Sequence, residues 1–402
     1  MKVLIAGGGI GGLTTALCCL HHGHDVTVFE QAPAFDEVGA GIQLPPNAMK
    51  VFEALGVDSV MAEKAFEPEA IEARMGETGR TLFTIPLAEQ SIAMWGSPYL
   101  HIHRADYIAA LRDALLNRAL YAVAVNAKVT AYTQDREGVT VTLENGRQFS
   151  GDVLIGADGI KSSIRDIMLG PDDPVFTGNM AWRAVVPIEA LGAHLPNPTA
   201  CVWMGKGRHA VTYRLRKGQL ANFVGVVERD DWAEESSTEE NWTEQGRRKD
   251  AMKDFAGWHP VITKLIENVP ESALYRWALF DRKPLPRWTD GRVALLGDAA
   301  HPMLPFLAQG AAMAVEDAWI IAHELSQSGQ TVSTSLNAYQ ARRFDRTSRA
   351  QAGSRANMKT FHQRTKTGQI KTYGSMWLGG RLAPRLVHKR MNWLYGYDVT
   401  AG

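Results

Sequence analysis

Five glycines fall within six residues near the N-terminus, directly after a short apolar segment. Lys2 to Ala6 is typical of a buried strand, and Leu13 to His22 is typical of a helix that Gly23 ends. Only a tight turn can join the two, because nothing but Gly7 to Gly12 lies between them. A second strand is predicted from Asp25 to Glu30, and this order of elements starts a parallel α/β sheet.

The glycines follow the spacing GxGxxG, and an acidic residue stands 18 positions after the last of them. In such a unit Gly7 makes the turn, Gly9 lets a pyrophosphate approach the backbone, and Gly12 packs the helix against the strand. The carboxylate of Glu30 would bind ribose hydroxyls and would repel a 2′-phosphate, which disfavours NADP at this site. The pattern predicts a dinucleotide site for NAD or FAD.

A second glycine-flanked acid, Asp298, follows the predicted strand Val293 to Leu296. It stands where open α/β sheets bind ligands, and it can accept hydrogen bonds from a sugar hydroxyl. Two prolines delay the next helix, Gly310 lets the chain turn, and the helix runs on from Ala311. Its free N–H groups favour an anion such as a reduced flavin. Together with the N-terminal turn, this stretch indicates a flavin enzyme.

Three further positions are candidates for cofactor contacts. Asp158 stands between glycines after a buried strand, Arg104 lies near a predicted helix start, and Gly41 belongs to the flexible, nearly uncharged loop Gly39 to Asn47. Each has a plain structural alternative. These are a simple turn for Asp158, a surface ion pair for Arg104 and a mere connection for Gly41.

The pattern changes between Met180 and about Tyr275, where alternating strands predict a separate antiparallel sheet. In the strand His209 to Leu215, period two places His209 and Tyr213 on one otherwise apolar face. We interpret this face as a pocket wall. The alternative is a core strand whose two polar tips find internal hydrogen-bond partners.

The totals exclude several function classes. Lys plus Arg and Asp plus Glu balance at 43 each in 402 residues, which gives no global field for nucleic acid or a membrane. Three cysteines without CxxC spacing predict no disulfide framework and no metal site, and they fit a reducing cytoplasm. Between Ala341 and Tyr397, thirteen basic residues face the single Asp345. These bases either face acids elsewhere in the fold or attract an anionic nucleotide or a partner subunit.

Three segments together resemble the single-component flavoprotein aromatic hydroxylases, a family of FAD monooxygenases. They are Gly7 to Gly12 with Glu30, Gly156 to Gly159, and Gly297 to Pro302. The C-terminal Asn392 to Asp398 looks most like the salicylate, 3-hydroxybenzoate and 6-hydroxynicotinate branch.

The resemblance implies an α/β fold with three parts. A discontinuous, GR2-type Rossmann-like FAD-binding domain would take residues 1–75, 100–178 and 272–340. A substrate domain built on the antiparallel sheet would take 76–99 and 179–271, and a C-terminal helical region would take 341–402.

The resemblance also implies roles for single residues. Glu30 would bind the adenosine ribose, Arg104 the pyrophosphate region and Asp298 the ribityl chain, while Asp158 would serve FAD and the transient NADH or NADPH. The expected cofactor-binding residues are Gly7, Gly9, Gly12, Glu30, Gly41, Arg104, Asp158, Asp298, Gly310 and Ala311. The expected substrate-binding residues are Gln43, His209, Tyr213, Pro305 and Phe306, of which Tyr213, His209 and Pro305 would act in catalysis.

The substrate cannot be copied from the relatives in this branch. The resemblance places His in 6-hydroxynicotinate hydroxylases at the positions of Gln43 and Phe306, and Gln in 3-hydroxybenzoate 6-hydroxylases at that of Pro305. Pro305 does match a proline whose carbonyl faces substrate and flavin in 4-hydroxybenzoate hydroxylases. We therefore expect a substrate that is neither 3-hydroxybenzoate nor 6-hydroxynicotinate.

The activity implied is hydroxylation of a small phenolic or hydroxypyridine carboxylate, as in salicylate hydroxylases. NADH or NADPH would reduce FAD, O₂ would add at the flavin C4a, and the resulting hydroperoxide would transfer OH to the ring. Two alternatives remain: oxygenation of a larger polyketide, antibiotic or quinone-precursor scaffold, and a non-catalytic flavin-binding regulator. Ring position, decarboxylation, the choice of nicotinamide donor and a possible homodimer stay open.

Overall fold

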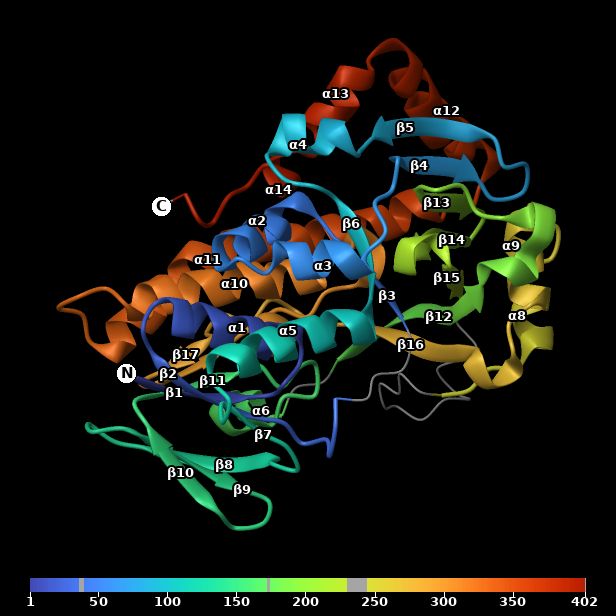
Figure 1. Ribbon diagram of the computed structural model, residues 1–402. Helices are drawn as coiled ribbons and strands as arrows, with labels where there is room; N and C mark the ends of the chain where they lie inside the picture. The colour runs from blue at the N-terminus through green and yellow to red at the C-terminus, as the bar shows by residue number, and fades with distance from the viewer. Residues whose placement is uncertain (36–39, 172–173, 230–243, 402) are drawn as a thin grey trace.

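The computed structural model describes residues 1–35, 40–171, 174–229 and 244–401 (Figure 1). Gly39, at the start of the expected Gly39 to Asn47 loop, lies outside these ranges. Among the described residues, no helix combines the length and the apolar character needed to cross a bilayer.

A six-stranded sheet forms the base of the molecule. Its order is β17 (Thr289–Asp290), β18 (Val293–Leu295), β11 (Val153–Gly156), β1 (Lys2–Ala6), β2 (Asp25–Phe29) and β7 (Val123–Ala124). All neighbours pair in parallel except β17 and β18. The register aligns Ala6 with Gly156 and Phe29, and Gly156 with Leu295. The residues that follow β1, β2, β11 and β18 therefore share one edge of the sheet.

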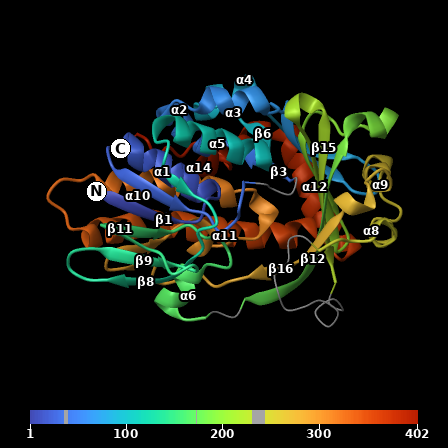
Figure 2. The same cartoon turned by 60° about the horizontal axis from the view of Figure 1, so that its bottom comes forward.

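Helices cover one face of this sheet and a small sheet covers the other (Figures 1 and 2). The helices are α1 (Ile10–His21), α5 (Arg104–Arg118) and α10 (Gly310–Leu325). The small sheet contains β8 (Val129–Gln134), β9 (Val139–Leu143) and β10 (Gln148–Gly151), and Phe149 meets Phe29 with ring centroids 5.0 Å apart. The strands between these layers are apolar and buried, as their sequence pattern predicts.

A seven-stranded sheet stands beside the first. Its order is β16 (Tyr275–Asp281), β12 (Val175–Pro187), β15 (Leu220–Glu228), β14 (Arg208–Leu215), β13 (Ala200–Gly205), β4 (Ala70–Met75) and β5 (Thr81–Pro86). The sheet is mixed rather than antiparallel throughout, because β13 pairs with β4 in parallel. It also extends past the expected domain limits, since β4 and β16 were assigned to the FAD-binding domain. Which strands belong to this sheet depends on pairing between residues more than a hundred positions apart. A local sequence pattern does not predict such pairing.

The remaining short elements are β3 (Gly41–Leu44), β6 (Leu100–His103), α2 (Pro46–Leu55), α3 (Asp58–Lys64), α4 (Glu89–Trp95), α6 (Ser163–Leu169), α8 (Arg248–Asp254) and α9 (Pro260–Glu267). Of these, α6 lies by the small sheet, whereas α8 and α9 pack against the seven-stranded sheet (Figure 1). The expected flexible loop around Gly41 thus contains β3, paired antiparallel with β6, and the first residues of α2. α2 starts at Pro46, which suits the first turn of a helix because proline has no N–H to satisfy.

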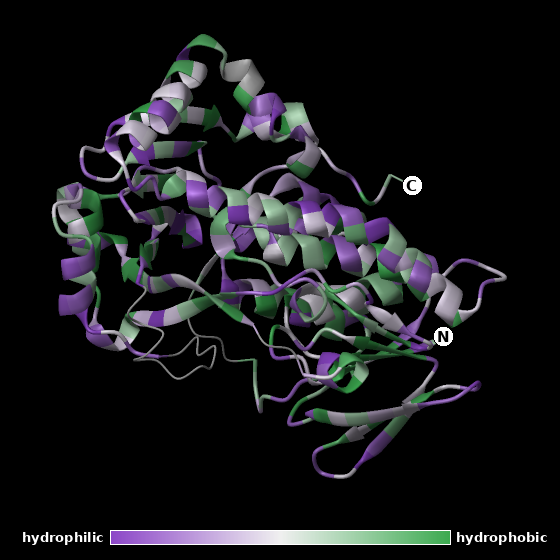
Figure 3. Cartoon of the chain, turned by 180° about the vertical axis from the view of Figure 1, so that it is seen from behind, coloured by the Kyte–Doolittle hydropathy of each residue, from purple (hydrophilic) through white to green (hydrophobic). Residues whose placement is uncertain are grey.

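The C-terminal part begins with α11 (Val332–Phe361), a long helix that runs past both sheets, and continues through α12 (Lys366–Leu382), α13 (Pro384–Lys389) and α14 (Asn392–Tyr395) (Figure 1). α11 crosses the expected limit at 341. The long helices mix hydrophilic and hydrophobic residues along their length (Figure 3). Several of the C-terminal bases face acids elsewhere in the fold, in the pairs Arg342–Glu324, Arg343–Asp317, Arg346–Glu316, Arg355–Asp281 and Arg364–Glu228. This supports the first of the two interpretations of the basic region.

Candidate cofactor and substrate site

The N-terminal glycines differ in what surrounds them. Gly7 has φ of 105°, and a Cβ there would lie 2.4 Å from the carbonyl oxygen of Ala157. A Cβ on Gly12 would lie 1.9 Å from the carbonyl oxygen of Gly7. Around Gly9, which precedes α1, a Cβ would meet no described atom within 4 Å. Two glycines are therefore required by the protein's own backbone, and the middle one leaves space at the N-terminus of α1, where a phosphate binds best.

Glu30 is held at the edge of the sheet by backbone donors. Its Oε2 accepts a hydrogen bond from Gly8 N at 2.8 Å, and its Oε1 accepts one from Ala32 N at 2.8 Å. The carboxylate therefore lies against the glycine turn. This position suits a ligand that passes over the turn, because a carboxylate can accept further hydrogen bonds from hydroxyls.

Both carboxylate oxygens of Asp158 accept hydrogen bonds from residues that follow it closely in the sequence. Its Oδ1 accepts from Ser162 Oγ at 2.5 Å and its Oδ2 from Ile164 N at 3.1 Å, at the start of α6. Burial raises the pKa of this carboxyl, and these hydrogen bonds oppose the rise. The simple-turn alternative is thus directly supported. Asp158 nevertheless lies beside the glycine turn, because a Cβ on Gly7 would lie 2.9 Å from its Cα.

Asp298 lies close to the start of α10. A Cβ on Gly310 would lie 3.8 Å from Asp298 Oδ1. The surrounding protein raises the pKa of Asp298, and the charges of His301, Arg104 and Arg282 oppose the rise. The side chain is nonetheless exposed to solvent. Asp298 thus lies beside the start of α10, and Arg104 is near enough for its charge to act on the Asp298 carboxyl; their roles in FAD binding stay predictions.

The turn before α10 differs from expectation in one respect. α10 includes Gly310, which lies in the helix's first turn and does not make the preceding bend. The left-handed residue is Ala308, with φ of 52°. β18 likewise ends at Leu295, and Gly297 has φ of 61°, a conformation that glycine adopts easily.

A buried ion cluster that the sequence did not reveal holds this turn in place. Asp317 contacts His301 Nε2 at 2.5 Å and Arg343 Nε at 2.6 Å. Glu316 contacts Arg343 Nη1 at 2.6 Å and accepts from Asn47 Nδ2 at 2.6 Å. The side chains of Glu316, Asp317 and Arg343 have no exposed surface. The available signal was a pair of adjacent acids within the mostly apolar stretch Ala311 to Ala322.

Side chains of α11 hold the backbone that leads to Phe306. Gln351 donates to the carbonyl of Pro302 at 2.8 Å, and Ser354 donates to that of Leu304 at 2.5 Å. Asn357 donates to the carbonyl of Phe306 at 2.9 Å. These donors recur every three residues, so they lie along one side of the helix. Pro305 stays exposed while Phe306 is buried, so the segment presents its proline outward.

The wall around Tyr213 also contains His101, Tyr99 and Asn222, which the sequence did not single out. Tyr213 packs directly on Gly41, where a Cβ would lie 2.4 Å from its ring, and its ring centroid lies 4.7 Å from that of His101. Gly41 N donates to Asn222 Oδ1 at 2.9 Å, and Gln43 Oε1 accepts from Tyr99 Oη at 2.5 Å. Glycine at position 41 is thus required by Tyr213.

Tyr213 and His209 lie on the same face of β14 and are both buried. Burial raises the pKa of the Tyr213 hydroxyl, while the charge of Arg183 opposes the rise. Burial lowers the pKa of His209 well below its usual value, and a proton on the neighbouring His362 would add to this effect. His209 is therefore neutral and Tyr213 protonated near neutral pH. The opposite face is also buried, because Ala210 packs in a second core with α8 and α9.

His209 meets Phe306 with ring centroids 5.2 Å apart. Its Nδ1 atom contacts Nε2 of His362 at 2.6 Å. This partner stands 153 positions away in the sequence, just after α11. The expected pairing of His209 and Phe306 at one site is therefore supported, and His362 is a member that the sequence analysis missed.

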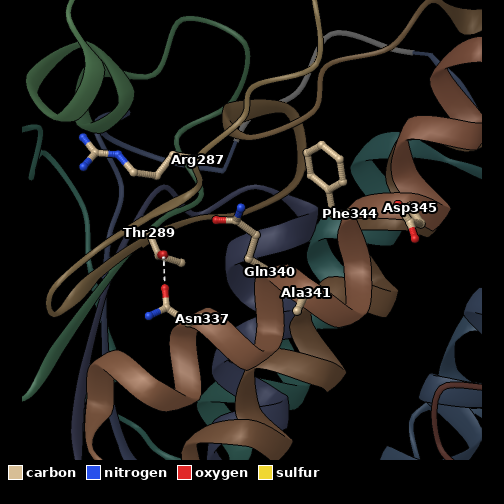
Figure 4. A pocket seen from close by; sticks show the side chains of 7 residues that line it. All are labelled: Arg287, Thr289, Asn337, Gln340, Ala341, Phe344 and Asp345. Atoms are coloured by element: carbon tan, nitrogen blue, oxygen red, sulfur yellow. Dashed lines mark hydrogen bonds between the residues drawn. The ribbon is translucent and has the colours of Figure 1, made fainter.

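A surface pocket of about 440 Å³ lies between β17 and α11, away from these residues (Figure 4). Its lining is Arg287, Thr289, Asn337, Gln340, Ala341, Phe344 and Asp345, and Thr289 Oγ1 bonds Asn337 Oδ1 at 2.7 Å. It contains none of the expected site residues.

Comparison with known proteins gives a consistent result. Residues 1–354 match the family described as "FAD binding domain". The chain is 37% identical to 3-hydroxybenzoate 6-hydroxylase 1 of Aquipseudomonas alcaligenes, over 99% of this chain and 98% of that protein. It is 34% identical to 6-hydroxynicotinate 3-monooxygenase of Pseudomonas fluorescens, over 99% and 95% of the two chains.

A solved structure agrees in fold. Klebsiella pneumoniae HpxO complexed with FAD and uric acid superposes with a TM-score of 0.85 at 28% identity, over 98% of this chain and 97% of that one. The open space at Gly9 and the exposed Asp298 beside the start of α10 are compatible with the cofactor of this family. The chain belongs to the FAD-binding flavoprotein monooxygenases that hydroxylate aromatic compounds, with NADH or NADPH as electron donor.

Proposed function

We propose that this monooxygenase hydroxylates a small phenolic or hydroxypyridine carboxylate. The observation that carries the proposal is the buried face of β14, which sets a neutral histidine and a protonated tyrosine on one wall. A neutral His209 can take a proton from a substrate hydroxyl, and Tyr213 can donate a hydrogen bond to the resulting oxyanion. Relatives that act on 3-hydroxybenzoate and 6-hydroxynicotinate support this substrate class.

The hydrogen bonds around His209 determine which of its nitrogens is basic. When His362 carries its single ring proton on Nδ1, that N–H donates to Glu228 Oε1 at 3.2 Å. Nε2 of His362 is then an acceptor, so His209 donates to it from Nδ1. The proton of neutral His209 therefore lies on Nδ1, and its Nε2 lone pair is free to act as a base.

The chain's residues would bind the cofactor, stabilise negative charge on its ring and exclude water. When bound, FAD supplies the oxygen-activating chemistry. The Gly7 to Gly12 turn, Glu30 and Asp298 would hold its nucleotide and ribityl portions, and the N-terminus of α10 would stabilise negative charge on the ring. Tyr213 on Gly41, together with buried Phe306, excludes water from the reacting centre. Pro305 remains a proposed substrate contact, as does Gln43.

The test is NAD(P)H oxidation by the FAD-loaded protein with a panel of hydroxylated benzoates and pyridine carboxylates. We expect one of them to raise the rate and to yield a hydroxylated product by mass spectrometry. If oxidation never responds to any member of the panel, or if peroxide is the only product, the proposed substrate class is wrong. O₂ as co-substrate, a homodimer and a cytoplasmic location are part of the same proposal.

A further inference from the structure

A line of hydrogen-bonded groups runs from His209 to the surface. His209 on β14 contacts His362, which follows α11, and His362 contacts Glu228 at the end of β15. Arg364 Nε then donates to Glu228 Oε2 at 2.6 Å. His209 and Glu228 lie on neighbouring strands of one hairpin, whereas His362 and Arg364 belong to the segment after α11, more than 130 residues further along the chain.

The exposed fraction of the side chains is lowest at the two histidines and rises through Glu228 to Arg364. His209 is 1% exposed, and the His362 side chain is also 1% exposed. The Glu228 side chain is 22% exposed and that of Arg364 is 65% exposed. The inner end is sealed by Phe306 and Phe361, whose ring centroids lie 5.2 and 5.1 Å from that of His209. A proton on His209 therefore has no direct contact with water on this side but is two hydrogen bonds from a partly exposed carboxylate.

We propose that His362 and Glu228 form a proton route that connects His209 with bulk water. The proposal rests on the proposed function, in which His209 takes the proton of a substrate hydroxyl. His362 and Glu228 are positioning residues in this scheme, since both act through His209.

The proposed transfer from substrate to water conserves protons and electrons at every step. The substrate O–H bond breaks as His209 Nε2–H forms, and the Nδ1 proton of His209 passes to Nε2 of His362. The Nδ1 proton of His362 passes to Glu228, and its carboxyl releases a proton to water. One proton moves from substrate to solvent, and no electron is transferred. The same steps in reverse, in which His209 Nε2–H protonates the product oxyanion and a proton from water re-enters through Glu228, restore both histidines.

Glu228 is suited to the outer end of the route. Burial raises the pKa of its carboxyl, but the contacts with His362 and Arg364 outweigh burial and lower the pKa overall. Glu228 therefore returns to the carboxylate near neutral pH after each transfer. Arg364 is the charged group that contacts it from the side of solvent.

A first experiment needs no substrate. Histidine labelled with ¹⁵N in the FAD-loaded protein reports the protonation of each ring nitrogen. We expect Glu228→Gln, which removes the charge but keeps the shape, to shift the resonances of both His362 and His209. Unchanged His209 resonances in that variant would show that the three groups are not coupled, and the route would be wrong.

A second experiment measures the transfer itself. The probe is 3-hydroxy-4-nitrobenzoate, whose phenolate absorbs visible light, bound to the oxidised enzyme and subjected to a pH jump. We expect His362→Gln to slow phenolate formation about tenfold or more while the probe's Kd changes little, and added imidazole to restore the rate. Wild-type rates in His362→Gln would overturn the proposal.

The matched control is Tyr373→Phe. Tyr373 Oη donates to the carbonyl of Phe361 at 2.8 Å, so this variant disturbs the segment that carries His362 but removes no group from the route. We expect it to keep the wild-type rate; equal slowing in both variants would indicate a merely structural role. Substrate-stimulated NAD(P)H oxidation in the unaltered enzyme separates the two ideas. Its absence overturns the proposed function, whereas stimulated hydroxylation with unaffected proton transfer in His362→Gln overturns only the route.

Discussion

Gly9 and Gly12 belong to one motif but serve different partners. A side chain on Gly12 would collide with Gly7, whereas a side chain on Gly9 would meet only space that the cofactor is expected to fill. The sequence predicted both roles, because the turn is local and its spacing is informative. The need for glycine at position 41 could not be predicted in this way, because the Tyr213 ring that excludes a Cβ lies 172 positions away in the chain.

We predict that Gly12→Ala destabilises the folded protein, whereas Gly9→Ala weakens FAD binding. Gly12→Ala should lower the free energy of unfolding of the FAD-free protein by about 1–3 kcal/mol through overpacking. Gly9→Ala should leave that free energy unchanged and weaken FAD binding, since φ of −74° suits alanine. Urea unfolding and flavin titration measure the two effects. Equal loss of stability in both variants would contradict the assignment of Gly9.

At Asp298, the prediction concerns retention of the flavin. Asp298→Ala should weaken FAD binding by about 2 kcal/mol, the range for a hydrogen bond to a charged group. The control is Asp345→Ala, an exposed acid in the pocket of Figure 4. Flavin content after gel filtration reports the outcome. A variant that keeps its full flavin content would show that Asp298 does not hold the ribityl chain.

The site is assembled by the shared edge of the parallel strands and by buried contacts between distant helices and strands. Only the first of these could be predicted from the sequence. Parallel strands place their carboxyl ends on one edge, so Glu30, Asp158 and Asp298 were expected to lie near one another. The buried contacts of Arg343 with Glu316 and Asp317 join α11 to α10, and no sequence pattern reports them, since each ion pair spans more than twenty residues. The His209–His362 contact is a longer example of the same kind.

Breaking the α10–α11 ion cluster should be costly. Arg343→Met leaves the carboxylates of Glu316 and Asp317 buried with fewer partners, and we expect the free energy of unfolding to fall by about 3–5 kcal/mol. Arg247→Met removes a pair with Asp250 whose arginine is 82% exposed and should cost less than about 1 kcal/mol. Urea unfolding of both variants checks this. Similar losses in the two would mean that the cluster adds little.

Across the whole molecule, buried neutral histidines should make stability depend on pH. Burial lowers the pKa of His101 to about 3. Between its ordinary value near 6.5 and about 3, the unfolded chain binds a proton at this residue that the folded chain does not. The contribution of His101 to the free energy of unfolding is therefore fully present above about pH 6.5. Below that pH it falls by about 1.4 kcal/mol per pH unit. His101→Gln should flatten the slope of unfolding free energy against pH by that amount; an unchanged slope would show that His101 is charged when folded.

The most direct test of the whole account is hydroxylation under ¹⁸O₂. The FAD-loaded enzyme is given NAD(P)H and the aromatic carboxylate that stimulates oxidation best, and the product is analysed by mass spectrometry. The account predicts a product in which one oxygen atom of the ring carries the label from O₂. An unlabelled product, or consumption of NAD(P)H with the aromatic compound recovered unchanged, would contradict it.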